Sequence, residues 1–236
     1  MTPEDIVELF RLDVDDTDAN DPLWSDLEVY NYLDEAQKQF ARETDYFSDA
    51  STADICIATI TADDPWVTLD PRVTKIRAAQ LGSTGSKVTP VTFAQMEDQP
   101  NTVDTYGSPF NFSSTYKWQQ ATGTPRFAVT DMERNKLRLA SIPQVDDTLN
   151  MQVYRLPLKD ITEDSARFEV EETEYQRGLM YMMKYLAYSK NDVDTFEQDL
   201  ADRAMAAAAA FHYKAKRDMK RRRYSSHTGT VRYAGL

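Results

Sequence analysis

The chain has 236 residues, of which 41% are hydrophobic, and a formal net charge of -12. This apolar fraction is enough for a folded core and excludes disorder of the whole chain. The acidic balance argues against a surface built as a whole to bind nucleic acid. No apolar run approaches the roughly 20 residues that a membrane span needs, and the acidic N-terminus is unlike the basic start of a signal peptide.

The charge is distributed unevenly along the chain. Residues 214–236 carry eight cations against the single acid Asp218, a net charge of +7, which leaves -19 for residues 1–213. Such asymmetry indicates an interaction segment. The cations are Lys214, Lys216, Arg217, Lys220, Arg221, Arg222, Arg223 and Arg232.

Two helices are predicted in residues 1–50. Thr2 and Asp5 indicate the start of a helix over 3–13, and an acidic connector, expected to be solvated, follows it. The next helix begins at a specific signal and runs to about residue 44, with Ser25 as the cap and Glu28 completing a capping box. This helix-start motif consists of Leu23, Trp24, Ser25 and Glu28.

The composition of residues 51–160 is typical of an antiparallel sheet, because short segments rich in Val, Ile, Thr and aromatic residues alternate with Pro and Gly. A short helix is expected at 92–97 and a long loop with a functional role at 98–123. The predicted strands are 55–61, 66–69, 73–81, 87–91, 126–130, 136–140 and 148–156.

Residues 161–220 predict a helical hairpin. Thr173 and Gln176 indicate the start of its first helix, and Asp194 can cap the second, which contains an alanine run. Residues 221–236 lose the helical pattern and are predicted to be a basic extended tail. Four residues of the first helix are interpreted as core packing rather than as a binding surface: Met180, Met182, Met183 and Tyr185.

Helices at both ends and strands between them predict an α+β fold. The N-terminal hairpin (1–50) and the C-terminal hairpin (161–220) are expected to form one helical bundle, with the antiparallel β lobe (51–160) inserted between them.

The sequence contains no recognisable catalytic, cofactor or metal motif. His212, His227 and the lone Cys56 do not have the spacing of a zinc site or of a Cys-His nucleophile. A calcium loop starting at Asp13 fails, because Asp18 replaces its glycine and Trp24 its closing glutamate. We therefore expect no enzyme, no cofactor and no metal, while a hydrolytic tail component that uses two carboxylates stays open as the last-ranked reading.

The helix-start motif, together with residues 32–37 and 41–44, resembles the opening of the head-to-tail adaptor (connector) proteins of short-tailed bacteriophages. The likeness continues in 123–127, in 154–158 and from Leu186 to Phe196. The matching residues are helix starts and packing positions, so they carry the fold rather than a binding site.

This resemblance implies a structural virion protein at the head-to-tail interface, made in the host cytoplasm and without a membrane segment. About twelve copies would form a ring below the portal protein, extend the DNA channel and give the tail or nozzle protein a platform. The acidic body would let the passing DNA slide without sticking.

The resemblance also implies that the basic C-terminal segment docks onto the portal. The expected docking residues are Lys214, Lys216, Arg217, Lys220, Arg221, Arg222, Arg223, Tyr224, Arg232 and Tyr233. The alternative reading is a nucleic-acid-binding protein that acts through the same basic tail.

Overall fold

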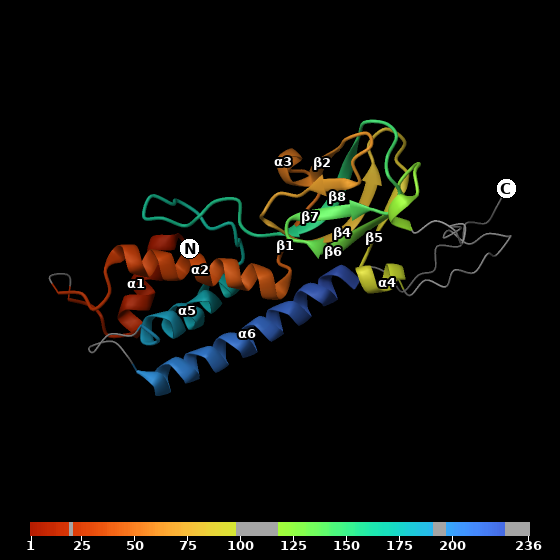
Figure 1. Ribbon diagram of the computed structural model, residues 1–236. Coiled ribbons are helices and arrows are strands. Elements are labelled where there is room, and N and C mark those ends of the chain that lie inside the picture. Colours follow the sequence, from red (N-terminus) through yellow and green to blue (C-terminus); the bar gives the residue numbers. More distant parts are fainter. Residues whose placement is uncertain (19–20, 98–117, 191–196, 225–236) are drawn as a thin grey trace, which may run out of the picture. The chain divides into compact units, whose positions relative to one another are not determined.

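The computed structural model describes residues 1–18, 21–97, 118–190 and 197–224. The chain divides into two compact units. The helical unit comprises Met1–Phe47 and Leu156–Leu236, and the β unit comprises Ser48–Arg155 (Figure 1). With six α-helices and an eight-stranded sheet among the described residues, the fold belongs to the predicted α+β class.

The first two helices begin at the predicted capping boxes. Before α1 (Pro3–Asp13), Thr2 Oγ1 accepts a hydrogen bond from Asp5 N at 3.2 Å, and Asp5 accepts one from Thr2 N at 2.6 Å. Ser25 and Glu28 repeat this exchange before α2 (Asp26–Thr44), at 3.4 and 3.0 Å. Each box satisfies backbone donors that a helix start leaves unpaired, so local sequence is enough to fix both starts.

The acidic connector between α1 and α2 is not simply solvated, which corrects our expectation. Asp16 is only 4% exposed and accepts hydrogen bonds from Leu23 N, at 2.8 Å, and from the Arg11 guanidinium. Arg11 also donates to Trp24 O at 2.9 Å and to Asp26 at 2.7 Å. One arginine therefore neutralises a buried carboxylate and ties the end of α1 to the start of α2.

The second helical pair differs from the prediction at its ends. α5 (Thr173–Tyr188) has Glu172 as its N-cap, without a side-chain cap bond, so the expected capping box of Thr173 and Gln176 is wrong. The buried Gln176 amide donates instead to Val170 O at 2.7 Å and anchors the incoming chain. The predicted cap Asp194 lies outside the described residues.

α6 (Gln198–Tyr224) continues through residues 221–224, where the sequence predicted an extended tail. Lys and Arg are good helix formers, and tertiary contacts hold this end of the helix in place. Met219 is buried, and Arg222 bonds to Glu172. The expected tail 225–236 lies outside the described residues.

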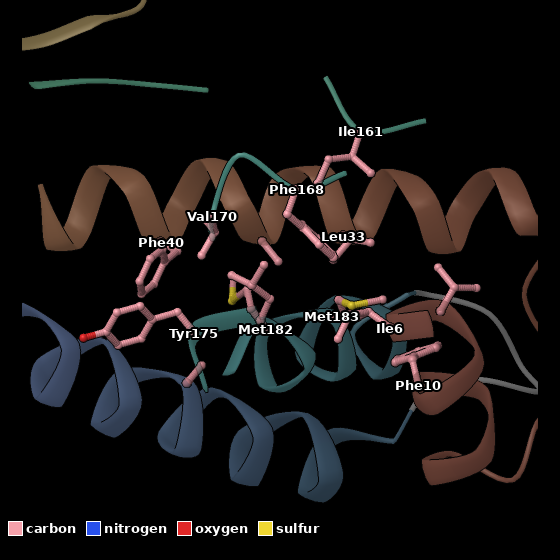
Figure 2. Close-up of a cluster of buried hydrophobic side chains, with 14 of the residues drawn as sticks. Ile6, Phe10, Leu33, Phe40, Ile161, Phe168, Val170, Tyr175, Met182 and Met183 are labelled. Atoms are coloured by element: carbon pink, nitrogen blue, oxygen red, sulfur yellow. The ribbon is translucent and has the colours of Figure 1, made fainter. Parts of the chain in front are cut away.

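The four long helices share one hydrophobic core. Leu33 and Phe40 of α2 face Tyr175, Met182 and Met183 of α5, as Figure 2 shows. α1 adds Ile6 and Phe10, α6 adds Ala208, Ala215 and Met219, and the segment before α5 adds Ile161, Phe168 and Val170. The predicted core role of Met182 and Met183 is confirmed, since they are 5% and 0% exposed, and Met180 and Tyr185 pack partly buried against the same core.

The strands follow the predicted ones closely, with β1 as an addition and with a helical turn, α3 (Ala53–Cys56), where we expected the first strand to begin. Their order in the sheet is β1-β8-β4-β5-β6-β7-β3, and β2 also pairs with β8. The strands are β1 (Phe47–Asp49), β2 (Ile57–Ile60), β3 (Trp66–Thr68), β4 (Val73–Leu81), β5 (Lys87–Val91), β6 (Phe127–Glu133), β7 (Lys136–Leu139) and β8 (Asp147–Arg155).

The sheet is not wholly antiparallel, which corrects our expectation. β5 and β6 pair in parallel, with Thr89 opposite Phe127 and Val91 opposite Val129. A parallel neighbour needs a long connection, and residues 92–126 provide one. This connection contains α4 (Phe93–Glu97) and the 3-10 turn η1 (Trp118–Gln120), while 98–117, most of the predicted loop, lies outside the described residues.

The residues on either side of 98–117 contact each other within the β unit. Trp118 is 8% exposed, and its indole Nε1 donates to Glu97 Oε1 at 2.7 Å. The Arg138 guanidinium lies 5.3 Å from the centre of the Trp118 ring and 5.6 Å from that of Trp66. The two ends of the long connection are therefore fixed to the sheet by a hydrogen bond and by cation–π contacts.

A buried ion pair joins the first and last strands of the β unit. Arg155 Nε donates to Asp49 Oδ2 at 2.7 Å, and the two side chains are 11% and 6% exposed. Asp49 also accepts from Ser51 N at 2.9 Å and from the Thr52 hydroxyl at 2.7 Å. Burial by itself would raise the pKa of Asp49, but these donors hold it well below its usual range.

Candidate docking surface

The expected docking cations lie on the last three turns of α6. Lys214, Lys216, Arg217, Lys220, Arg221 and Arg222 are exposed, whereas Ala215 and Met219 between them are buried in the core of the helical unit. Arg223 and Tyr224 belong to the same helix, and Arg232 and Tyr233 lie outside the described residues. The buried residues fix the direction in which the cations point, because an α-helix presents only one side to its core.

Two of these cations are bound to acids of their own unit. Lys214 Nζ donates to Glu174 Oε1 and Arg222 Nη1 to Glu172 Oε1, both at 2.7 Å. The Arg222 guanidinium also lies 5.9 Å from the centre of the Tyr175 ring. These contacts hold α6 against the start of α5, so Lys214 and Arg222 serve the fold.

Glu172 is the centre of this contact, because it accepts hydrogen bonds from the Tyr46 hydroxyl and from Arg222. Burial opposes its charge, but the two donors outweigh this effect and lower the pKa of Glu172. Burial and the neighbouring carboxylate raise the pKa of Tyr46, so this hydroxyl keeps its proton. The hydrogen bond that Lys214 donates to Glu174 is the main cause that raises the pKa of Lys214.

The other four cations face away from the core. Lys216, Arg217, Lys220 and Arg221 have no hydrogen bond or ion pair to the part of the chain that the structure describes. We call them the outer cations. The sequence alone did not distinguish them from Lys214 and Arg222, because the acids that bind those two lie about forty and fifty residues earlier in the chain.

The helix-start motif has a structural role. Trp24 is 2% exposed, and its ring packs edge-on against Phe10 at 6.0 Å and against Tyr188 at 6.1 Å. Glu28 closes the capping box and also forms an ion pair with Lys190, with 2.7 Å between Nζ and Oε1. The hydrogen bond from Lys190 is the main cause that lowers the pKa of Glu28. Leu23 is 46% exposed and contributes its backbone N–H rather than its side chain.

His212 has a buried position that sequence reasoning did not assign. Its Nδ1 lies 2.6 Å from Glu43 Oε2, its ring packs against Phe40 at 5.7 Å, and its Nε2 has no hydrogen-bond partner among the described residues. The apolar residues at helical spacing on either side of His212 could have indicated that this histidine is buried. The pair links α2 to α6, which is a packing role.

No group of three or more potential metal ligands occurs within the described ranges, and no helix there is both long and apolar enough to cross a bilayer.

An open cavity of about 560 Å³ on the β unit is lined by Cys56, Lys87 and Met151 among others. Burial, followed by the charge of Asp49, raises the pKa of the Cys56 thiol and opposes the thiolate form that a nucleophile requires.

The chain thus consists of a helical unit that presents outward cations and of a β unit. A family model described as "SU10 adaptor protein" matches residues 1–233, so the chain belongs to the SU10 adaptor family. No curated protein matches the sequence. The family confirms the resemblance to phage head-to-tail adaptors and identifies a structural component of the virion that interacts with portal and tail.

Proposed function

We propose that this protein forms a ring of about twelve copies beneath the portal, where it extends the DNA channel and provides the platform for a tail or nozzle protein. The family supports this role. The core shared by α1, α2, α5 and α6 supports a helical bundle as the frame of each copy, with the β unit as its lobe. A structural role of this kind requires no catalysis.

The outer cations are proposed to dock onto acidic surfaces of the portal. The observation that carries this step is the division of cations on α6: Lys214 and Arg222 are bound internally, whereas Lys216, Arg217, Lys220 and Arg221 are exposed and face outward. In a chain of net charge -12, four outward cations on two successive turns are a site for an anionic partner. Arg223, Tyr224, Arg232 and Tyr233 would extend this contact.

The acidic remainder of the chain is proposed to flank the channel. A wall of net negative charge repels the DNA phosphates, so the genome can slide past without binding. Replacing the exposed connector acids Asp15, Asp18 and Asp21 with amides, while keeping the buried Asp16, should then slow genome ejection. Unchanged ejection kinetics would reject this part of the proposal.

The experiment that tests docking is sedimentation of the purified protein with DNA-filled, tail-less phage heads. Saturation at about twelve copies at one vertex supports the proposal. A variant with Glu at all four outer cations should lose binding. The matched control places Glu at four exposed cations elsewhere and has the same net charge: Arg77, Arg134, Lys159 and Arg167.

These charge reversals are a sharper test than truncation after residue 213. That truncation would also remove Ala215 and Met219, which are buried, and the Arg222–Glu172 contact. The same exposed cations keep the nucleic-acid-binding alternative testable. Absence of head binding together with salt-sensitive retention on free duplex DNA would favour that alternative over portal docking.

A further inference from the structure

The outer side of α6 carries a continuous exposed seam. Residues 199, 202, 206, 209, 213, 216 and 220 are alternately three and four apart, a spacing that keeps them on one side of a helix. All seven are exposed, while Ala201, Ala204, Ala208, His212, Ala215 and Met219 face the core of the helical unit. The seam therefore has no partner in the described part of the chain.

The chemistry of the seam changes along the helix in three blocks. It begins with the acids Asp199 and Asp202, the latter also accepting a hydrogen bond from Gln198 at 2.7 Å. The middle is apolar, with Ala206, Ala209 and Tyr213, which is 71% exposed, and Met205 beside them is 52% exposed. The end is basic, with Lys216 and Lys220, and the other two outer cations, Arg217 and Arg221, lie beside them.

We propose that two copies of this protein pair through α6 in antiparallel orientation. A seam ordered acidic, apolar and basic is complementary to itself only when the second helix runs in the opposite direction, because each acidic block then faces a basic block. A parallel pair would set acids against acids and cations against cations. The occupant of this face that fits best is thus the same face of a second copy.

One register brings the charges of the seam and of the neighbouring Arg217 together. With the two-fold axis beside Ala209 and Ala210, Asp199 lies opposite Lys220 and Asp202 lies opposite Arg217. In the same register Ala206 receives Tyr213, so a small residue faces the largest one, and the helices approach each other most closely at the alanines. In this register Lys216 lies at the level of Arg203 of the second copy, so the pair is held by the two acid–base contacts at each end and by the apolar contacts in the middle.

This inference rests on the proposed function for its biological meaning. The pairing covers the cations that are proposed to dock onto the portal, so the dimer is a storage form that keeps them from other anionic partners. An acidic portal surface competes for the same residues and separates the two copies. Self-association and docking are measured separately, because the first requires only the purified protein.

The first test is sedimentation velocity of the full chain over a range of concentrations, with two charge-reversed variants. One combines Asp199→Lys with Asp202→Lys, and the other combines Arg217→Glu with Lys220→Glu. The wild type should dimerise, and each variant alone should be monomeric because positions 199 and 220, and positions 202 and 217, then carry like charges that face each other. An equimolar mixture of the two variants should restore dimers, since opposite charges then face each other at positions 199 and 220 and at positions 202 and 217.

The matched control combines Glu163→Lys with Asp164→Lys, an equal charge change at exposed acids away from α6, and should leave the wild-type dimer intact. In about 1 M salt, where screening reduces charge contacts to short range, the wild-type dimer should weaken. A monomeric wild type at all concentrations, or a mixture that remains monomeric, would overturn the inference. If the protein stays monomeric but still binds phage heads, the outer cations bind only the portal and the proposed function is retained.

The second test addresses the register by oxidative cross-linking. In the antiparallel pair the two copies of residue 209 are adjacent, whereas the two copies of residue 206 lie about 10 Å apart along the helix axis. Ala209→Cys should therefore form a disulfide dimer and Ala206→Cys should not. The wild type contains the buried Cys56 and therefore measures the background level of cross-linking. Equal cross-linking at both positions would reject the register.

Discussion

Arg222, near the end of α6, and Glu172, the residue before α5, are joined by a hydrogen bond of 2.7 Å between Nη1 and Oε1. The same carboxylate accepts a hydrogen bond from the hydroxyl of Tyr46, two residues after the end of α2. One acid thus brings three helices of the helical unit together at one end. This contact separates a cation that stabilises the fold from the outer cations beside it in the sequence.

We predict that Glu172→Gln destabilises the helical unit. The lowered pKa of Glu172 means that its contribution to the free energy of unfolding is present above the ordinary glutamate pKa of about 4.3 and is lost as the pH falls below it. Urea unfolding at neutral pH and at acid pH measures this. The variant should differ from the wild type at neutral pH and converge with it in acid, and a constant difference would contradict the assignment.

The companion variant Tyr46→Phe tests the other hydrogen bond of Glu172. It should lower the free energy of unfolding by about 1 kcal/mol, because it removes one hydrogen bond and leaves the Arg222 contact in place. Tyr181→Phe, which changes an exposed tyrosine of α5, is the control and should have no measurable effect.

Gly178→Ala should destabilise the chain, although alanine favours a helix interior over glycine. A Cβ at position 178 of α5 would lie 1.9 Å from Cζ of Phe211 on α6, and the whole ring would have to move. Overpacking of this kind costs about 1 to 3 kcal/mol, which exceeds the helix-propensity gain of about 1 kcal/mol. Thermal unfolding measures the change. Combining it with Phe211→Leu should recover part of the loss, and an increase in Tm for Gly178→Ala alone would be inconsistent with close α5–α6 packing.

Asp49→Asn should destabilise the β unit by about 3 to 5 kcal/mol, because it removes the carboxylate that pairs with the largely buried Arg155 guanidinium. The lowered pKa of Asp49 makes this contribution fully present above the ordinary aspartate pKa of about 3.9, and it disappears as the pH falls toward the lower folded-state value. Chemical denaturation followed by the tryptophans of the β unit measures it. Glu133→Gln removes an exposed pair with Lys136 and should cost no more than about 1 kcal/mol.

Trp24→Ala should cost about 3 to 5 kcal/mol, because the ring fills the space between Phe10 and Tyr188. Trp24→Phe should cost less, because the buried indole Nε1 has no partner in the described residues and its loss breaks no hydrogen bond. Equilibrium unfolding of each variant tests this order. Leu23→Ala, at an exposed position of the same motif, should be close to neutral, and a large loss of stability there would contradict the exposed position of this side chain.

The parts of this fold that the sequence predicted are those whose causes are local. Thr2 with Asp5, and Ser25 with Glu28, lie within one helical turn of each other, so their capping boxes could be recognised from spacing. The strands from β3 to β5 follow from residue type and from the turns that bound them. The concentration of cations after residue 213 is likewise a property of the sequence itself.

What only the tertiary structure decided depends on partners that are distant in the chain. Asp16 is buried because the folded connector brings it to Arg11. β5 pairs in parallel with β6 because the long connection between them brings the chain back to the end of the sheet at which β5 began. The sequence supplied the cations of α6, but Glu172 and Glu174 decided which of them stabilise the fold and which remain for a partner. The sequence shows which charged residues are present, whereas the packing of the helices determines which of these residues form ion pairs.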